Sequence, residues 1–384
     1  MTLENQTMEL KVLKPFFNDP FLLLITILIL TFGIVMVTSA SFMIASAKFG
    51  DGFYYAKKQG LAMIAGLSLM LLCSRINPFF WRDYASIGLG ISLFLLVLVF
   101  VPGIGVELGG SRRWLRLPFG FYIQPSEIIK YAMIIFFARS LAKKGDGVKS
   151  FAIGFLPHVL VMALVVMLAL FQPDFGLALI ITTVGFLMMF VAGVRLQHLV
   201  GSAILCLPFL FQIGMSAHYR FARFKSFLDP WANPLSTGFQ VIQSLVAFGC
   251  GGFWGVGLGK GIQKLFYLPQ PHSDFILAVI GEELGLSGVI FIILLFYLLI
   301  FRGLMIAIRT QDIFLRCLSF GITSLIGIQC LLNMAVTMGL TPTKGLPLPL
   351  VSLGGTSIMA NLGGIGILMA VSATVQANRE GVKS

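Results

Sequence analysis

Residues 289–301 read VIFIILLFYLLIF, an apolar run in which polar residues do not alternate with apolar ones. A membrane β-strand needs short alternating segments, so this run predicts a helix. The wider stretch, residues 276–301, is long enough to cross the hydrocarbon core as a helix. Of the whole chain 58% is hydrophobic and 11% charged, whereas roughly a quarter of a soluble protein is charged. The sequence therefore predicts an all-α integral membrane protein.

Apolar stretches of similar length recur along the chain on both sides of this run. We expect ten transmembrane helices, at residues 20–43, 56–74, 84–102, 125–142, 152–171, 176–194, 197–215, 276–301, 313–338 and 356–377. They form one membrane domain, residues 20–377, between short tails at 1–19 and 378–384. A large loop, residues 216–275, separates helices seven and eight. The first stretch is too long for a removable signal peptide, so it predicts a permanent helix.

The distribution of Lys and Arg predicts the orientation of these helices. An even number of helices puts both termini on one side, and that side carries more Lys and Arg than the short loops opposite. The positive-inside rule then places both termini in the cytoplasm and the loop 216–275 outside.

The outer loops nevertheless contain many cations, although the net charge of +12 is partly explained by the inner loops. These outer cations are Arg112, Arg113, Arg116, Arg220, Arg223, Lys225, Lys260, Lys264 and Lys344. Paired Arg and Lys side chains are what phosphate and diphosphate groups require, so we expect an anionic ligand at the outer leaflet. Trp114, next to Arg113, has a simpler alternative role as an interfacial anchor.

Two short motifs flank predicted helix starts. In QPSEIIK, residues 124–130, Pro125 begins a helix on which Glu127 and Lys130 share a face and neutralise one another. Such a pair is either a structural ion pair or part of a site that faces a water-filled cavity. In QPDFG, residues 172–176, Asp174 is expected to cap the following helix.

Asp274 lies where the large outer loop meets an apolar helix. It is either an N-cap or a general base, and the second role needs partial burial that raises its pKa. On a continuous helix Glu282 would be the only one of the following acids near Asp274, and Glu283 would point away. Gly281 and Gly285 are positions at which that helix could break.

The remaining outer segments are irregular or short. Residues 339–356, GLTPTKGLPLPLVSLGGT, cannot form a regular helix, so they must be buried in protein or line a cavity. Lys344 then either faces the same cavity as Asp274 or belongs to a rigid plug. Residues 219–231 suit a helix lying flat in the interface, and residues 239–248 are too short to span. Residues 249–264 predict a flexible, Gly-rich surface turn without the Ser or Thr of a phosphate-binding loop.

Taken together, these stretches resemble the SEDS family of shape, elongation, division and sporulation proteins. The resemblance is carried by GSRRWLRL (110–117), IQPSEIIK (123–130), QPDFG (172–176), YRFARFKSFLDPWANP (219–234), QKLFYLPQPHSDFILAVIGEELG (263–285) and TPTKGLPLPLVSLGG (341–355). It covers residues 20–377. FLDPWANP, GEELG and TPTKGLPLPL are most similar to the cell-division branch of the family.

The resemblance implies a glycosyltransferase in the bacterial cytoplasmic membrane, at the division septum. It would polymerise lipid II, the undecaprenyl-diphosphate-linked disaccharide-pentapeptide, and work with a class B penicillin-binding transpeptidase and other divisome membrane proteins. The family's aspartate maps onto Asp274 as general base. Substrate-binding positions are expected at Arg112, Arg113, Trp114, Glu127, Lys130, Lys264, His272 and Lys344.

No cofactor, metal site or nucleic-acid module is evident, because the Cys and His residues are scattered, although a divalent cation is compatible with a diphosphate ligand. The chain departs from the family at Gln270, where an acid is usual, at Leu353, where an aromatic residue is usual, and at Gly261, where Ser is usual. A lipid II flippase and a non-catalytic scaffold are the alternatives. Because the ionisable residues gather at the outer edge rather than in mid-span, the polymerase is favoured over the flippase.

Overall fold

The computed structural model describes residues 19–108, 111–116, 122–202, 204–205, 225–236, 238–265, 267–343 and 345–381. Its α-helices are α1 (Pro20–Phe49), α2 (Tyr54–Arg75), α3 (Pro78–Leu98), α4 (Pro125–Lys144), α5 (Leu156–Phe171), α6 (Phe175–Val191), α9 (Phe239–Gly251), α10 (Ile276–Arg309), α11 (Ile313–Thr337) and α12 (Gly355–Gly381). Short helical turns lie at Gly145–Lys149, Phe151–Phe155 and Pro230–Ala232. Strands β1 (Gly105–Leu108), β2 (Ser111–Arg116) and β3 (Tyr122–Ile123) form one antiparallel sheet.

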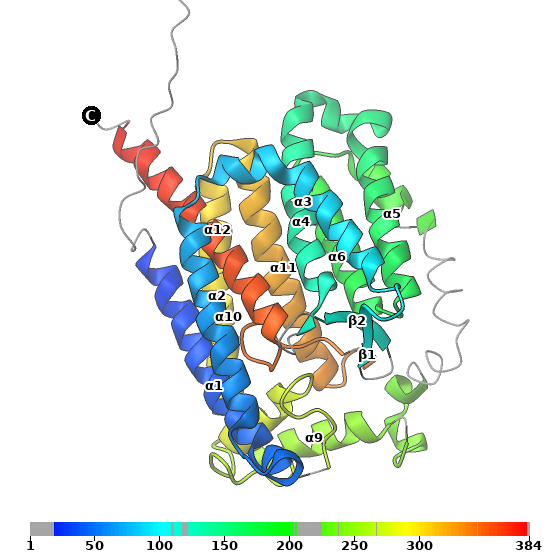
Figure 1. Ribbon diagram of the computed structural model, residues 1–384, viewed down its shortest axis with the longest axis vertical. Helices are drawn as coiled ribbons and strands as arrows, with labels where there is room; N and C mark the ends of the chain where they lie inside the picture. The colour runs from blue at the N-terminus through cyan, green and yellow to red at the C-terminus, as the bar shows by residue number, and fades with distance from the viewer. Residues whose placement is uncertain are drawn as a thin grey trace, which may run out of the picture.

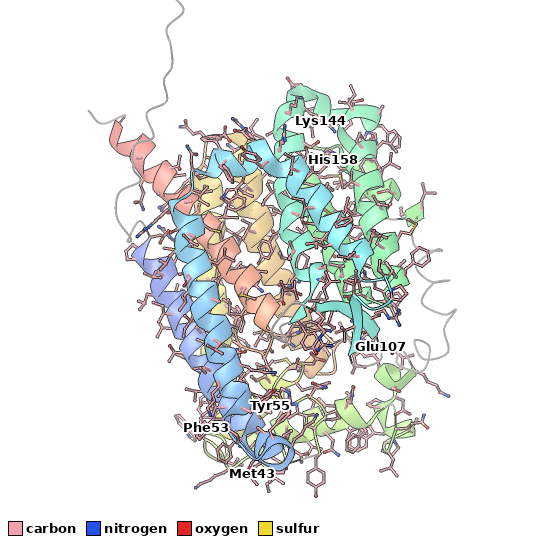
Figure 2. The ribbon with its side chains drawn as sticks, viewed as in Figure 1. Met43, Phe53, Tyr55, Glu107, Lys144 and His158 are labelled. Atoms are coloured by element: carbon pink, nitrogen blue, oxygen red, sulfur yellow. The ribbon has the colours of Figure 1, made fainter. Side chains whose placement is uncertain are left out.

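The long helices stand side by side as a bundle with two different ends (Figure 1). One end carries the sheet and α9, and we call it the sheet end. The opposite end, where α1 begins and α12 finishes, is called the terminus end. Figure 2 shows Tyr55 and Glu107 at the sheet end and Lys144 and His158 at the terminus end.

The helical membrane architecture expected from the sequence is confirmed. Among the described residues, seven helices are long and apolar enough to cross a membrane. Helix α4, which carries several charges, and α6, with 17 residues, coincide with two further expected spans. The span expected at 197–215 lies mostly outside the described residues, so the count of ten stays a prediction.

Some boundaries differ from the expected ones, and each has a local cause. Helix α3 begins at Pro78, earlier than expected, because Asn77 caps the amide of Phe79 at 3.0 Å. Helix α1 begins at Pro20 as expected, with Asp19 accepting a hydrogen bond from the amide of Leu22. The buried Asp19 carboxylate also pairs with Arg302 at 2.9 Å, which ties the start of α1 to α10.

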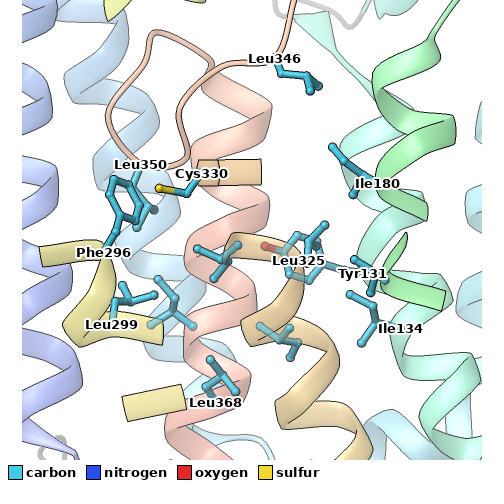
Figure 3. Packing of buried hydrophobic residues seen from close by; sticks show 14 of the residues in the cluster. Tyr131, Ile134, Ile180, Phe296, Leu299, Leu325, Cys330, Leu346, Leu350 and Leu368 are labelled. Carbon is cyan, nitrogen blue, oxygen red and sulfur yellow. The ribbon is translucent and has the colours of Figure 1, made fainter. Parts of the chain in front are cut away.

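Helices α11 and α12 form the centre of the bundle. In their apolar windows 67% and 78% of residues are buried, against 22% in α2 and α3. Figure 3 shows Leu325 and Leu368 from these helices packed among Tyr131, Phe296 and other buried side chains. Helices α2 and α12 approach closely, since a Cβ on Gly366 would lie 2.3 Å from the carbonyl oxygen of Met70.

Helix α10 is broken at Gly285, whose φ of 65° and ψ of −162° are not helical. Residues 252–257 run beside the break and satisfy it, because the amides of Val256 and Gly257 donate to the carbonyls of Glu282 and Glu283, both at 3.0 Å. Most of residues 252–264 are exposed and form turns, as expected for 249–264, whereas residues 249–251 belong to α9. This segment is fastened to α10 by main-chain hydrogen bonds.

Helix α9 lies across the sheet end, roughly perpendicular to the bundle (Figure 1). A Cβ on Gly251 would lie 1.8 Å from the carbonyl oxygen of Gly281, so α9 meets α10 backbone to backbone. The hydroxyl of Ser244 donates to the carbonyl of Thr337 at 2.6 Å and joins α9 to α11. The 13 residues of α9 agree with the expectation that this segment is too short to span the membrane.

Candidate functional site

Asp274 sits in the turn that leads into α10 and is partly buried. The N-cap residue of α10 is Phe275, so the alternative in which Asp274 caps this helix is wrong. Its carboxylate Oδ1 accepts a hydrogen bond from the hydroxyl of Ser273 at 3.1 Å. The Asp274 carboxylate therefore does not serve as the cap of α10.

The backbone around Asp274 is held by three donors from two other segments. The carbonyl of His272 accepts from the amide of Leu353 at 2.9 Å, and that of Ser273 from the hydroxyl of Ser352 at 2.6 Å. The carbonyl of Asp274 accepts from the side-chain amide of Asn333 at 2.9 Å. Because three consecutive carbonyls are fixed, the position of the Asp274 side chain is set by the Pro-rich loop and by α11.

The Pro-rich loop, residues 339–355, is mostly buried in its second half, as expected for irregular backbone at membrane depth, whereas Leu340 and Gly345 in its first half are exposed. Leu348, Leu350 and Val351 are at most 1% exposed, and Gln59 of α2 donates to the carbonyl of Ser352 at 3.3 Å. Figure 3 shows Leu346 and Leu350 at one edge of the buried cluster.

Gly345 of this loop lies directly beneath the Asp274 carboxylate. A Cβ at this position would be 3.1 Å from Oδ2 of Asp274, so any side chain here would crowd the carboxylate. The neighbouring Lys344, one of the expected substrate-binding residues, lies outside the described residues. The loop thus approaches the Asp274 carboxylate at Gly345 and bonds the two residues before it through Leu353 and Ser352.

His272 is 8% exposed and stacks on Tyr55 of α2, with ring centroids 4.7 Å apart. Burial, together with the positive charge of Lys48, lowers the pKa of His272 to about 4. The imidazole is therefore neutral near pH 7. Among the described residues its Nδ1 has no hydrogen-bond partner, so a polar ligand atom could be accommodated there.

Arg112 and Arg113 have different surroundings although they are adjacent on β2. A bulge in the pairing of β1 with β2 sets Val106 opposite Trp114 and Glu107 opposite Arg112, which leaves Arg113 as the extra residue. Arg112 is exposed and Trp114 is half-buried. The bulge re-aims Arg113 toward the turn between α5 and α6.

The guanidinium of Arg113 is bound by that turn. Its Nε donates to the carbonyl of Gln172 at 3.1 Å, a second nitrogen donates to the carbonyl of Pro173, and Asp174 lies 3.8 Å away. Asp174 also caps α6 by accepting from the amide of Leu177 at 3.0 Å, as the sequence predicted. Arg113 consequently holds the sheet against α6.

The same turn reaches the Pro-rich loop, and so the sheet and Asp274 meet around that loop. A Cβ on Gly176 would lie 2.5 Å from the side chain of Leu346, and the carbonyl of Leu346 accepts from Asn333 at 2.6 Å. Because Asn333 also donates to the Asp274 carbonyl, its side-chain amide joins the Pro-rich loop to the turn that contains Asp274. The structure thus brings Arg113 and Asp274 to opposite sides of one loop.

Glu127 and Lys130 form the expected ion pair on α4, at 2.8 Å, with side chains at most 8% exposed. The start of α4 is fixed to α12, since the amide of Gln124 donates to the hydroxyl of Thr356 at 3.3 Å. One oxygen of Glu127, Oε2, has no hydrogen-bond partner in the described part of the chain. The pair is buried beside the end of the Pro-rich loop.

Lys264 is placed differently from the other expected substrate-binding residues. Its ammonium forms a buried ion pair with Glu283 and donates to Ser39 of α1 at 3.0 Å. Glu283 also accepts from the amide of Gly259, while Glu282 accepts from the amides of Ile262 and Gln263. Both acids therefore organise residues 259–264, and this arrangement favours a structural role for Lys264.

Sequence reasoning missed three residues that position Asp274, namely Asn333, Ser352 and Gly345. A buried amide such as Asn333 within an otherwise apolar span was the available signal, because polar groups inside membrane helices are costly and usually functional. Ser352 and Gly345 carried no such signal, since their roles depend on how the Pro-rich loop folds.

The chain matches known proteins along most of its length. Residues 20–377 match the profile of the cell cycle protein family that comprises FtsW, RodA and SpoVE. The probable peptidoglycan glycosyltransferase FtsW of Geobacter metallireducens is 48% identical over 93% of this chain and 95% of that protein. Stage V sporulation protein E of Bacillus subtilis is 42% identical over 92% and 96%.

Solved structures share the fold. A chain from a structure described as a peptidoglycan synthase complex, which coordinates polymerization and crosslinking, superposes with a TM-score of 0.77 and 29% identity over 93% of this chain and 98% of that chain. The rod shape determining protein RodA of Thermus thermophilus superposes with a TM-score of 0.66 and 26% identity over 91% and 95%.

Proposed function

Because the chain belongs to the FtsW, RodA and SpoVE family of cell cycle proteins, we propose that it polymerises lipid II into peptidoglycan glycan strands during cell division. It is a multi-pass membrane protein and, as its curated relatives are, a peptidoglycan glycosyltransferase. The observation that carries the finer proposal is the fixed position of the segment 272–274, whose three carbonyls accept hydrogen bonds from Leu353, Ser352 and Asn333.

In the proposed reaction Asp274 is the general base. Its carboxylate takes the proton from the 4-hydroxyl of the acceptor lipid II sugar, and that oxygen forms a bond to C1 of the growing chain. The bond from C1 to the diphosphate breaks, and undecaprenyl diphosphate leaves with the electron pair. The hydrogen bonds to the carbonyls of Asp274 and of the two residues before it support this role, because proton transfer requires a fixed geometry.

The leaving diphosphate needs cations, and Arg112 is the candidate that the described residues leave exposed. We assign the same task to Lys344, which precedes Gly345 in the sequence. Arg113 is proposed as a positioning residue, since its guanidinium is engaged by the turn at Gln172 and Pro173. Trp114 would pack beside the lipid at headgroup level.

Orientation and partners follow from the same proposal. The excess of Lys and Arg on the terminus end places both termini in the cytoplasm, so that Asp274 faces the outer leaflet. Similarity to a chain of a peptidoglycan synthase complex supports a class B penicillin-binding transpeptidase as partner.

The test is polymerisation of labelled lipid II by detergent-solubilised protein, with and without the partner transpeptidase. The protein should lengthen glycan chains, because detergent separates no compartments and leaves a flippase nothing to do. Asp274→Asn should abolish the product ladder while stability stays within about 1 kcal/mol, since Asn keeps an acceptor for Ser273. Asp51→Asn, which removes an exposed carboxylate from the same end, is the matched control.

A ladder of normal length from Asp274→Asn would reject the general-base assignment. Absence of polymer from folded protein with its partner, together with movement of lipid II across proteoliposome membranes, would instead establish a flippase.

A further inference from the structure

A polar pocket lies at the terminus end, far along the helices from Asp274. It has a volume of about 560 Å³ and opens between the start of α3, the last turns of α4 and the first turn of α11. Helices α3 and α11 are long and apolar enough to cross a membrane, and α4 coincides with an expected span, so we infer that their ends lie at the level of the lipid headgroups. The pocket therefore faces the interface and not the bundle core.

Three cations line this pocket, namely Arg82, Arg139 and Lys143. Arg82 stacks over the ring of Phe79, with 4.8 Å to the ring centroid, and this contact fixes its guanidinium. Arg139 donates through one nitrogen to the carbonyl of Asp83 at 3.1 Å, which leaves its other nitrogens for a ligand. Lys143 is exposed and has no ion pair with any residue in the described ranges.

The first turn of α11 adds main-chain donors to the same wall. Asp312 caps this helix by accepting from the amide of Leu315 at 2.9 Å, so the amides of Ile313 and Phe314 precede the capped one. Both residues line the pocket. Free amides in the first turn of a helix, together with its dipole, favour a bound anion.

The charge of the lining selects the type of anion. Two carboxylates, Asp83 and Asp312, offset two of the three cations, which leaves one net positive charge. Asp83 forms an ion pair with Arg82 at 3.4 Å, and the Asp312 carboxylate accepts the capping hydrogen bond of α11. A phosphodiester carries one negative charge and neutralises this lining, whereas a nucleotide triphosphate would leave excess negative charge.

We propose that this pocket binds the phosphodiester headgroup of an anionic membrane lipid. Basic pockets between transmembrane helices are typical binding sites for such headgroups. Arg139 and Lys143 would bind the phosphate oxygens, with the α11 amides beneath them. This site is separate from the proposed glycosyltransferase site and would stabilise the packing of α3, α4 and α11.

The experiment titrates the purified, detergent-solubilised full chain with phosphatidylglycerol or phosphatidylcholine and counts bound lipids by native mass spectrometry. Phosphatidylglycerol should bind preferentially. The double variant Arg139→Gln, Lys143→Gln should bind it roughly tenfold more weakly. The control double variant Lys149→Gln, Arg195→Gln removes two exposed cations outside the pocket and should not change the binding of phosphatidylglycerol.

A variant that should bind phosphatidylglycerol more tightly tests the proposal even if the double variant misfolds. Asp312→Asn keeps a capping acceptor for Leu315 and removes one negative charge from the pocket, so phosphatidylglycerol should bind several-fold more tightly. Equal binding of the two lipids, or equal losses in the test and control doubles, would overturn the proposal. Displacement of phosphatidylglycerol by millimolar inorganic phosphate would assign the pocket to a soluble anion and would also overturn it.

Discussion

Removing the ammonium of Lys264 tests whether the ion pair with Glu283 is structural. The Lys264 side chain is 5% exposed and that of Glu283 is fully buried. Among the described residues, Lys264→Met would leave Glu283 with the hydroxyl of Ser39, at 2.7 Å, and the amide of Gly259, at 3.1 Å, as its hydrogen-bond donors. An uncompensated buried charge lowers the free energy of unfolding by about 3–5 kcal/mol. Because two donors to Glu283 remain, we expect a loss of about 3 kcal/mol.

The free energy of unfolding in detergent, measured by denaturant titration, is the assay. Lys260→Met, which changes an exposed lysine of the same segment, should stay within about 0.5 kcal/mol of the unchanged chain. Lys264→Met combined with Glu283→Gln removes both charges and should recover more than half of the loss.

A different outcome would support the expectation from the sequence that Lys264 binds substrate. If Lys264→Met cost less than about 1 kcal/mol while lipid II polymerisation fell sharply, the lysine would act on substrate and the structural assignment would be refuted. Proportional losses of stability and activity across the three variants would support the buried pair.

Three further results are expected. Arg113→Lys should destabilise the protein by about 1–2 kcal/mol in thermal unfolding, because Lys cannot bond both turn carbonyls, whereas Arg112→Lys should leave stability unchanged and raise KM for lipid II. The free energy of unfolding should fall by about 3 kcal/mol between pH 6.5 and 4, where His272 takes up a proton only when unfolded, and His272→Phe should remove that part of the pH dependence. Gly251→Ala should lower the free energy of unfolding by about 1–3 kcal/mol, because the added Cβ would overpack the contact with the Gly281 carbonyl. Amide hydrogen exchange in α9 should then become faster.

Most of the helical framework follows from hydropathy, because lipid leaves a spanning chain few alternatives to a regular helix. Helix starts could also be predicted where a residue affects only the backbone next to it in the sequence. Pro20 and Pro125 begin helices, and Asp174 caps one. The start of α3 was missed because Arg82 and Asp83 interrupt the apolar pattern in its first turns.

The arrangement of side chains in the site followed less well from the sequence, because it depends on distant segments. Arg112 and Arg113 have the same chemistry and adjacent positions, and only the bulge opposite Glu107 separates their surroundings. Lys264 appeared to be a free outer cation until the break at Gly285 brought Glu283 to it. No spacing along the chain encodes either contact.

The break at Gly285 also makes the first part of α10 a lever arm. Asp274 lies eleven residues before the break, or about 16 Å along a helix, so a tilt of only about 4° at Gly285 would move the carboxylate by about 1 Å. A displacement of that size is enough to lower a catalytic rate by roughly a hundredfold. The main-chain hydrogen bonds from residues 252–257 therefore hold the arm at the break, while the Pro-rich loop and α11 hold its Asp274 end. A protein that pulled on residues 252–257 could then adjust the rate without contacting the proposed base.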